Sequence, residues 1–488
     1  MAVLLILCLC GATSRLRARE MPPLVAPQQA PHVSPPAVHT FPNGLEMAVI
    51  ERHDLPVVTL TLAIRSGSEA DPPGLPGTAQ LAAAMLDQGA SHRSAMQIAA
   101  LVDGAGGTLD TGAEWDDSYA RLTVLSGETP LAFDLLSGIT IHPQFAAREL
   151  ARVRKQTLSA LDVLRHEPGY LADTAIERIV FSGTPYAHPA EGVEQSIGRI
   201  TAGDLRAFHS RYYQPANAVL VVSGDVGTAQ ALELAQRYFG GWQGTGPPIR
   251  AAVKSPPAHP SRRIVVIDDP DAVQTEIRVA SLAIARDSPD YDALTVANQV
   301  LGGPAENILF TALRSRRGLV YGASSSIVCY RNAGVWELQT ATGSDTTIEA
   351  LRVILDEMKR LRHSALGDED VQMAQKYLIG HMALQFDTPD RTAERILDLM
   401  VYNLPLNTWS LYPQKVRQLT RDQVLEATRH YLDPRQAVIV LVGNAAAFKQ
   451  HLKEFGPVRI IPLARVDLSA AGLESPSQAA AVGTSGGG

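Results

Sequence analysis

ITAGDLRAFHSRYYQPANAVLVVSGDV, at residues 200–226, is repeated in altered form as LTRDQVLEATRHYLDPRQAVIVLVGNA at residues 419–445. In each copy a threonine opens a helical stretch, a proline follows it, and an apolar strand ends at a glycine. The offset is 219 residues throughout (420 − 201, 434 − 215 and 443 − 224), far longer than the period of a solenoid repeat. We therefore interpret the chain as two copies of one domain, which can face each other across a chamber. The landmark pairs are Thr201 and Thr420, Pro215 and Pro434, and Gly224 and Gly443.

The pattern around these copies predicts an α+β fold, because strands and helices are mixed without the regular spacing of βαβ units. The 488 residues divide into two homologous domains, at residues 40–243 and 261–465, and each is of ordinary domain size. The segment between them, residues 244–260 (GTGPPIRAAVKSPPAHP), has the proline and glycine content of a linker.

Local patterns predict several individual elements. Residues 40–50 read as a hairpin, because Asn43 and Gly44 separate two short apolar stretches. Residues 57–65 alternate as a strand does, and residues 263–267 are expected to open the second domain as a strand. Two helices are expected, one at the alanine-rich residues 78–88 with Gly89 as its cap and one at residues 145–165.

The two ends of the chain differ in composition from its body. Residues 2–12 (AVLLILCLCGA) are apolar but too short to span a bilayer as a helix, and they resemble the core of a secretory signal. We therefore expect a signal segment at residues 1–20 and export to the periplasm or beyond; the alternative is an apolar N-terminus of a cytoplasmic protein. Residues 21–39 are predicted to be a proline-rich linker, and residues 466–488 a disordered tail.

Charge and cysteine content exclude two classes of protein. The net charge of −7 provides no basic surface, so a nucleic-acid partner is not expected. If Cys8 and Cys10 leave with the signal, Cys329 remains alone, and an internal disulfide is impossible.

The segment GTAQLAAAMLDQGA, Gly77 to Ala90, resembles the active helix of the pitrilysin/insulinase metallopeptidase family. That family carries H-x-x-E-H on this helix, the inverted zincin motif. Positions i, i+3 and i+4 share one helix face, so two histidines bind one zinc ion while the glutamate reaches the zinc-bound water. The family's third ligand is a glutamate on a later helix.

In this chain the motif positions are Gln80, Ala83 and Ala84, and the third ligand's position is Ala160. An amide and three methyl groups thus replace the ligands and the general base. No replacement chemistry is evident: no two of the 13 histidines lie within four residues of each other, and no G-x-S-x-G motif is present. Asp87 and His92 lie near the helix in sequence, but we interpret them as isolated surface residues.

A second family site is retained. The stretch LFTALRSRRGLVYGASS, Leu309 to Ser325, resembles the one in which the family carries an arginine and, seven residues later, a tyrosine. The resemblance implies that Arg314 and Tyr321 hold a peptide backbone near its scissile carbonyl, a task that suits two hydrogen-bond donors. Arg316 and Arg317 are rival candidates. The simpler interpretation is a surface ion pair for Arg314 and a strand start for Tyr321.

The resemblance covers about residues 40–463 and implies a half-clamshell of the processing-peptidase type. Some family members are split between a zinc-bearing subunit and a subunit that keeps only the Arg/Tyr pair. We therefore expect the non-catalytic subunit of a heterodimeric zinc peptidase, inactive alone and binding no cofactor itself, with zinc and H-x-x-E-H in a homologous partner and a peptide as substrate. The alternatives are a stand-alone peptide-binding or scaffold protein and, third, a zinc peptidase active by itself.

Overall fold

The computed structural model describes residues 35–244, 246, 256, 261–304, 307–363 and 366–474. The predicted signal segment lies outside these ranges, as do most of both predicted linkers and residues 475–488.

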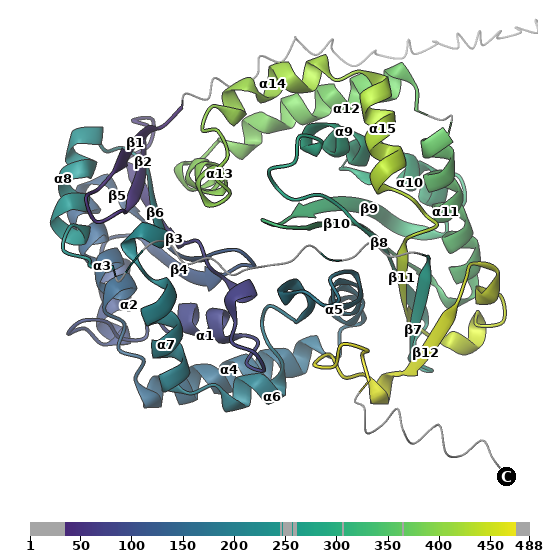
Figure 1. Cartoon of the computed structure of the whole chain (residues 1–488), viewed down its shortest axis with the longest axis horizontal. Coiled ribbons are helices and arrows are strands. Elements are labelled where there is room, and N and C mark those ends of the chain that lie inside the picture. Colours follow the sequence, from purple (N-terminus) through teal and green to yellow (C-terminus); the bar gives the residue numbers. More distant parts are fainter. Residues whose placement is uncertain are drawn as a thin grey trace, which may run out of the picture.

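The chain forms two six-stranded sheets, in the orders β1-β2-β6-β3-β5-β4 and β12-β7-β11-β8-β10-β9 (Figure 1). Five strands of each sheet match in order, while the sixth differs, because β1 is antiparallel to β2 and β12 is parallel to β7. Most neighbouring strands are antiparallel, while β2–β6 and the equivalent pair β7–β11 are parallel, as is β12–β7. This repeated mixed topology confirms the predicted α+β fold of two homologous domains. The first sheet comprises β1 (Ala37–Thr40), β2 (Glu46–Glu51), β3 (Val57–Ile64), β4 (Thr108–Ala113), β5 (Ser118–Leu125) and β6 (Ala218–Gly224). The second comprises β7 (Arg263–Asp268), β8 (Gln274–Leu282), β9 (Val320–Cys329), β10 (Gly334–Gly343), β11 (Val438–Gly443) and β12 (Val458–Pro462).

Helices pack on both faces of the sheets. Among the described residues, no helix has both the length and the apolar character needed to cross a membrane. The helices of the first half are α1 (Thr78–Ala84), α2 (Ala95–Gly104), α3 (Thr129–Ile141), α4 (Ala147–Leu164), α5 (Pro168–Val180), α6 (Glu194–Arg199), α7 (Ala202–Tyr212) and α8 (Thr228–Phe239). Those of the second are α9 (Tyr291–Gly302), α10 (Ile308–Phe310) with the π-helical turn η5 (Thr311–Ser315), α11 (Thr347–His363), α12 (Asp368–His381), α13 (Pro389–Val401), α14 (Thr408–Gln418) and α15 (Arg421–Tyr431).

The repeated segment folds in the same way in both halves. Thr201 caps α7 by accepting a hydrogen bond from the Asp204 amide at 3.2 Å, and Thr420 caps α15 by accepting one from the Gln423 amide at 3.3 Å. In both cases the third helical residue bonds back to the cap, which completes a capping box. The strands that follow, β6 and β11, are fully buried at the centre of their sheets.

The local predictions hold with two differences of extent. The hairpin is present as β1 paired with β2, but β1 begins at Ala37, inside the predicted linker of residues 21–39. The helix predicted at residues 78–88 ends at Ala84, because the Leu86 amide bonds three residues back to the Ala83 carbonyl, as in a turn. The strands at residues 57–65 and 263–267 and the helix at 145–165 appear as β3, β7 and α4.

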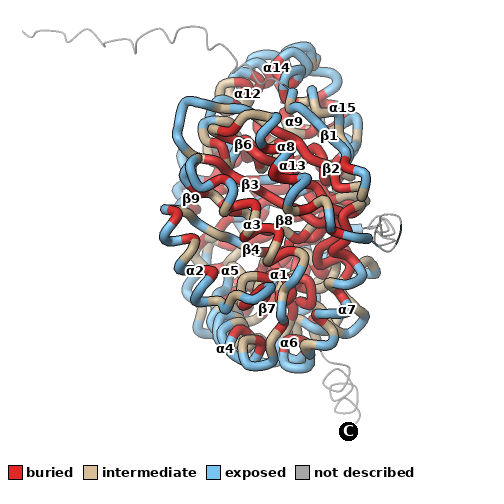
Figure 2. The backbone as a smooth tube through the Cα atoms, turned by 90° about the vertical axis from the view of Figure 1, so that its left-hand side faces the viewer, coloured by how far each residue is buried: buried red, intermediate tan, exposed pale blue. Residues whose placement is uncertain are grey.

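Each half lends one helix to the other half's sheet. Helix α13, from the second half, packs on β3 and β6 of the first sheet, and α5, from the first half, packs on β8 and β11 of the second. In Figure 1 both helices lie between the two sheets. Figure 2 shows the strands largely buried while the outer helical turns are exposed. The contact between the halves is therefore part of the hydrophobic core.

The residues after β12 correct the prediction of a disordered tail from residue 466. The Arg178 guanidinium on α5 donates hydrogen bonds to the carbonyls of Ser469 at 3.0 Å and Ala470 at 3.2 Å. Leu473 is buried with 1% of its surface exposed. Residues 466–474 thus bind the second half to α5, because they supply both apolar contacts and carbonyl acceptors.

A buried polar cluster joins the halves where the β9–β10 turn meets the first domain. Asp116 accepts a hydrogen bond from the Arg331 amide at 2.6 Å and another from the Tyr186 hydroxyl at 2.8 Å. The Arg331 guanidinium donates to the Asp116 carbonyl at 2.9 Å and approaches Glu69 at 3.5 Å. Glu69 is only 4% exposed, and burial, reinforced by the charge of Asp116, raises the pKa of its carboxyl to about 8.

This burial predicts that stability falls as the pH rises through the neutral range. The folded state keeps the Glu69 proton up to a pKa of about 8, whereas the unfolded chain loses it near the ordinary glutamate value of about 4.3. Between these values the folded state binds more protons, so each rise in pH favours unfolding. We expect Glu69 alone to lower the free energy of unfolding by about 2 kcal/mol from pH 6 to pH 8, measured by urea denaturation. The buried carboxyls of Asp71, Asp117 and Glu337, whose pKa values are also raised to about 8, add to the fall. Glu69→Gln should therefore reduce the dependence by the Glu69 share, and Glu426→Gln, at an exposed position on α15, should leave it unchanged.

Candidate functional site

Helix α1, which carries the positions of the zinc motif, is held at its start by a buried carboxylate. The Asp71 side chain accepts hydrogen bonds from the amides of Gly77 at 2.6 Å and Ala79 at 2.7 Å, and so satisfies free donors of the first turn. Gly77 adopts φ = 88°, and a Cβ at this position would lie 2.7 Å from the Glu191 carbonyl oxygen. Both features keep α1 in place without a metal.

Gln80 stands at the position of the first zinc ligand and is already engaged. Its Nε2 donates a short hydrogen bond to the carbonyl of Ala113, and its Oε1 accepts one from the Ala113 amide at 3.3 Å. Ala113 ends β4, one of the two edge strands of the first sheet. The amide therefore binds the helix to the edge strand through both of its polar atoms.

The other motif positions offer no ligand either. Ala83 has no exposed surface, Ala84 is half-buried, and Ala160 is exposed on α4. Within the described ranges, no group of three histidine, cysteine, aspartate or glutamate side chains could hold a metal ion. These residues do not fit the zinc ion that the motif holds elsewhere, because a zinc site needs imidazole, thiolate or carboxylate ligands.

The two polar residues that follow α1 in sequence do not combine into a site. Asp87 accepts a hydrogen bond from the Gln88 side chain at 2.6 Å, and burial raises the pKa of its carboxyl. His92 is exposed.

Arg314 and Tyr321 do come together. Arg314 belongs to the π-helical turn η5, and Tyr321 lies near the start of β9. The Arg314 guanidinium donates to the Tyr321 carbonyl at 2.6 Å and lies 4.7 Å from the centre of the Tyr321 ring and 5.2 Å from that of Phe310. The Tyr321 side chain remains exposed, with 86% of the residue's surface open to solvent. The stacked pair leaves the phenol hydroxyl and further guanidinium donors open to a ligand.

The rival arginines have other surroundings. Arg317 donates to the Ala312 carbonyl at 2.9 Å, which fixes it against its own turn. Arg316 lines a separate cavity between η5, α11 and α12. Only Arg314 stacks on Tyr321.

In the second half, Asn298 joins a helix to an edge strand as Gln80 does in the first, and the sequence pattern did not single it out. Asn298 on α9 donates to the Ser325 carbonyl at 3.0 Å and accepts from the Ser325 hydroxyl at 2.7 Å and the Trp336 indole at 2.9 Å. Ser325 lies in β9, the outermost strand of the second sheet. Asn298 follows Gln80 by 218 residues (298 − 80), one less than the offset of the repeat. Applied to Gln80, the 219-residue offset leads to Gln299, the next residue on α9, so the offset by itself misses Asn298 by one position.

Comparison with known proteins places this geometry in a family. The profile described as "Insulinase (Peptidase family M16)" matches residues 46–194, and "Peptidase M16 inactive domain" matches residues 199–378. A Mycobacterium tuberculosis protein named an uncharacterized zinc protease is 24% identical, over 85% of this chain and 95% of that protein. A Helicobacter pylori protein named a non-peptidase homolog is 23% identical, over 83% of this chain and 94% of its own. The solved peptidase M16 inactive domain from Pseudomonas fluorescens has a TM-score of 0.78 at 28% identity and covers 88% of this chain and 99% of its own.

The burial of Ala83 predicts that the catalytic glutamate of the motif cannot be restored without cost. Ala83→Glu places a carboxylate in the core and should lower the free energy of unfolding by about 3 kcal/mol. Ala84→Glu makes the same chemical change on the same helix at a half-buried position and should cost less than about 1 kcal/mol. Urea denaturation of both variants measures the difference. Equal losses would show that the two positions do not differ in packing.

Proposed function

Because this chain is an inactive-type member of the peptidase M16 (insulinase) family, we propose that it is the non-catalytic subunit of a heterodimeric zinc metallopeptidase. A homologous partner would carry H-x-x-E-H and the zinc ion. This chain would contribute Arg314 and Tyr321 to the partner's active site. The observation that carries the proposal is the contrast between a motif helix without ligands and an exposed Arg/Tyr pair with free donors.

The chemistry of the pair supports this assignment. In such a partner, zinc and a glutamate would supply the attacking water. A guanidinium and a phenol can both donate hydrogen bonds to the carbonyl oxygen of the scissile bond, and these bonds strengthen as negative charge develops there. Arg314 is preorganised for this role, because one of its nitrogens is held by the Tyr321 carbonyl and its Cζ lies 4.7 Å and 5.2 Å from the centres of two aromatic rings. The remaining donors therefore need little reordering when a peptide binds.

A second candidate is a stand-alone protein that binds peptides or braces a larger complex without cleavage. The name of the Helicobacter pylori relative, a non-peptidase homolog, favours it. The exposed and preorganised Arg/Tyr pair favours the first candidate. The third candidate, a peptidase active by itself, is disfavoured because none of the expected zinc-site positions carries a ligand. These positions are Gln80, Ala83, Ala84 and Ala160.

We also propose that the chain is exported, on the evidence of the apolar run at residues 2–12. Fractionation of cells that express the full chain tests this. Recovery of an N-terminally shortened chain from the periplasm supports export, and recovery of the intact chain from the cytoplasm contradicts it.

The subunit proposal predicts a specific loss in a reconstituted pair. The chain is co-expressed with a homologous chain that carries an intact H-x-x-E-H, and peptide turnover by the purified complex is measured. Arg314→Ala or Tyr321→Phe should lower turnover by about 10²- to 10³-fold, because each removes one donor to the developing oxyanion. Co-purification of the two chains should be unchanged. Arg417→Gln, an exposed arginine on α14, serves as the control.

Two results would overturn this assignment. One is full turnover in the Arg314→Ala and Tyr321→Phe complexes. The other is chelator-sensitive peptide cleavage by this chain alone, with stoichiometric zinc in the purified protein.

A further inference from the structure

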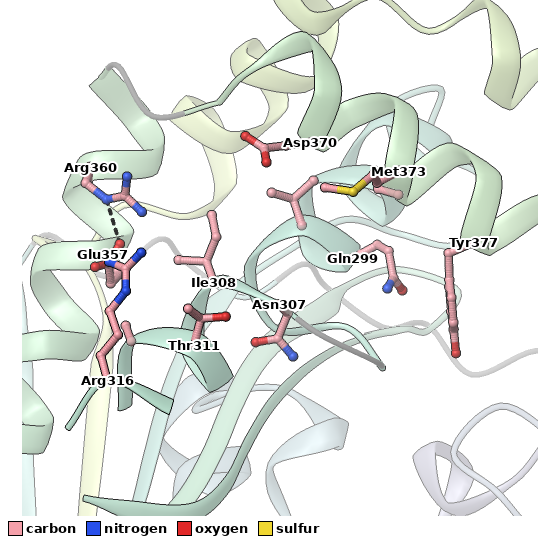
Figure 3. A pocket seen from close by; sticks show the side chains of 13 residues that line it. Gln299, Asn307, Ile308, Thr311, Arg316, Glu357, Arg360, Asp370, Met373 and Tyr377 are labelled. Atoms are coloured by element: carbon pink, nitrogen blue, oxygen red, sulfur yellow. Dashed lines mark hydrogen bonds and ion pairs between the residues drawn. The ribbon is translucent and has the colours of Figure 1, made fainter. Parts of the chain in front are cut away.

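A cavity lies beside η5, the turn to which Arg314 belongs, and Figure 3 shows the side chains that line it. Its volume is about 430 Å³, and its walls come from α9, from α10 with η5, from α11 and from α12. This volume is within the range of small-molecule sites, roughly 300–1,000 Å³. Because four packed elements form the walls, the cavity is a built part of the fold. Its apolar lining residues are Val300, Ile308, Ala312, Met373 and Ala374.

One margin of the cavity has an excess of positive charge. Arg360 on α11 donates to the Glu357 carboxylate at 2.7 Å, and Arg316 approaches the same margin from η5 (Figure 3). Among the residues that the structure describes, Arg316 has no carboxylate within ion-pair distance. Two guanidinium groups thus stand at this margin, and its one carboxylate, Glu357, is paired with Arg360. A negatively charged group here would gain charge-assisted hydrogen bonds from Arg316.

The other polar side chains that line the cavity differ in how many of their hydrogen-bonding atoms already have a partner within the protein. Asp370 accepts a hydrogen bond from the Gly367 amide at 2.9 Å, which commits it to the start of α12. Gln299 is 8% exposed and donates its Nε2 to the Pro304 carbonyl at 2.7 Å, which orients its amide and leaves Oε1 as an acceptor. Met373 is 62% exposed at the mouth, where its flexible thioether can adapt to varied apolar groups.

We propose that this cavity binds a peptide segment that presents a bulky apolar side chain next to a carboxylate. The apolar side chain packs against Ile308, Ala312 and Met373, and the carboxylate pairs with Arg316. Gln299 Oε1 accepts a hydrogen bond from the segment's backbone. The choice of a peptide as ligand rests on the proposed function, while the preference for an apolar and anionic group rests on the lining itself.

The π-helical turn explains how two neighbouring arginines serve two sites. Within η5 and the residue after it, Arg314 stacks on Tyr321 and Arg316 reaches the cavity. Such turns interrupt regular helical spacing and occur often at functional sites. The same structural element thus presents one arginine to Tyr321 and another to the cavity.

The experiment uses the full chain without a partner, so that it does not depend on peptidase activity. Isothermal titration measures binding of N-acetyl-Ala-Phe-Glu-Ala-amide and of two counter-probes, one with lysine in place of glutamate and one with alanine in place of phenylalanine. We expect each counter-probe to bind at least about tenfold more weakly. Arg316→Gln should reduce binding of the first probe about tenfold, and Met373→Ser should reduce it severalfold. Arg417→Gln should have no effect.

Three outcomes would overturn the proposal. The first is equal affinity for all three probes, or no binding of any. The second is an equal loss in Arg316→Gln and Arg417→Gln, which would indicate attraction to overall charge. The third is unchanged probe binding by Arg316→Gln together with weaker co-purification of the zinc-bearing chain, which would assign this surface to the partner. Failure of the subunit proposal is seen separately, in the turnover of the Arg314→Ala complex.

Discussion

Neither sheet of this protein is covered by its own half alone. The inner face of the first sheet, with Ala63, Val219 and Val221, shares one hydrophobic cluster with α13 of the second half. Helix α5 of the first half is buried with Val265 and Val440 of the second sheet in the same way. Because apolar burial is the main favourable term in folding, separating the halves would expose both faces at once. The contact between the domains is thus a core, and it sets the angle between them.

This shared core explains why ionisable groups can lie between the halves. Asp116 and Glu69 are buried, and their hydrogen bonds come from Arg331, from Tyr186 and, for Glu69, from the Gly67 amide at 2.8 Å. A buried ionic group costs free energy unless its partners are well placed. Because α5 and α13 pack against the sheets of the opposite halves, they hold these hydrogen-bonding partners in position. The start of β9, with Tyr321, is thereby fixed relative to the first domain, since Arg331 follows the end of the same strand.

The helix predicted to correspond to the zinc-motif helix serves as a structural joint. Alanine is the best helix former, so α1 persists although its ligands are gone, and Gln80 binds the edge strand through two backbone hydrogen bonds. Asn298 joins α9 to the other edge strand. Both halves therefore use an amide to connect a helix to an outer strand.

The sequence by itself determined the elements whose causes are local. Threonine caps such as Thr201 and Thr420, the turn at Asn43 and Gly44, and the 219-residue repeat all depend on hydrogen bonds and packing patterns within a few residues, which a sequence records directly. For the same reason, the sequence showed that Gln80, Ala83 and Ala84 offer no zinc ligand. It also showed the Arg314/Tyr321 motif. The tertiary structure alone decided the exchange of α5 and α13, the burial of Glu69 and the different surroundings of Arg314 and Arg316. Those features arise from contacts between segments far apart in the chain and from one π-helical turn, and no local pattern encodes which face a side chain meets after the two halves pack together.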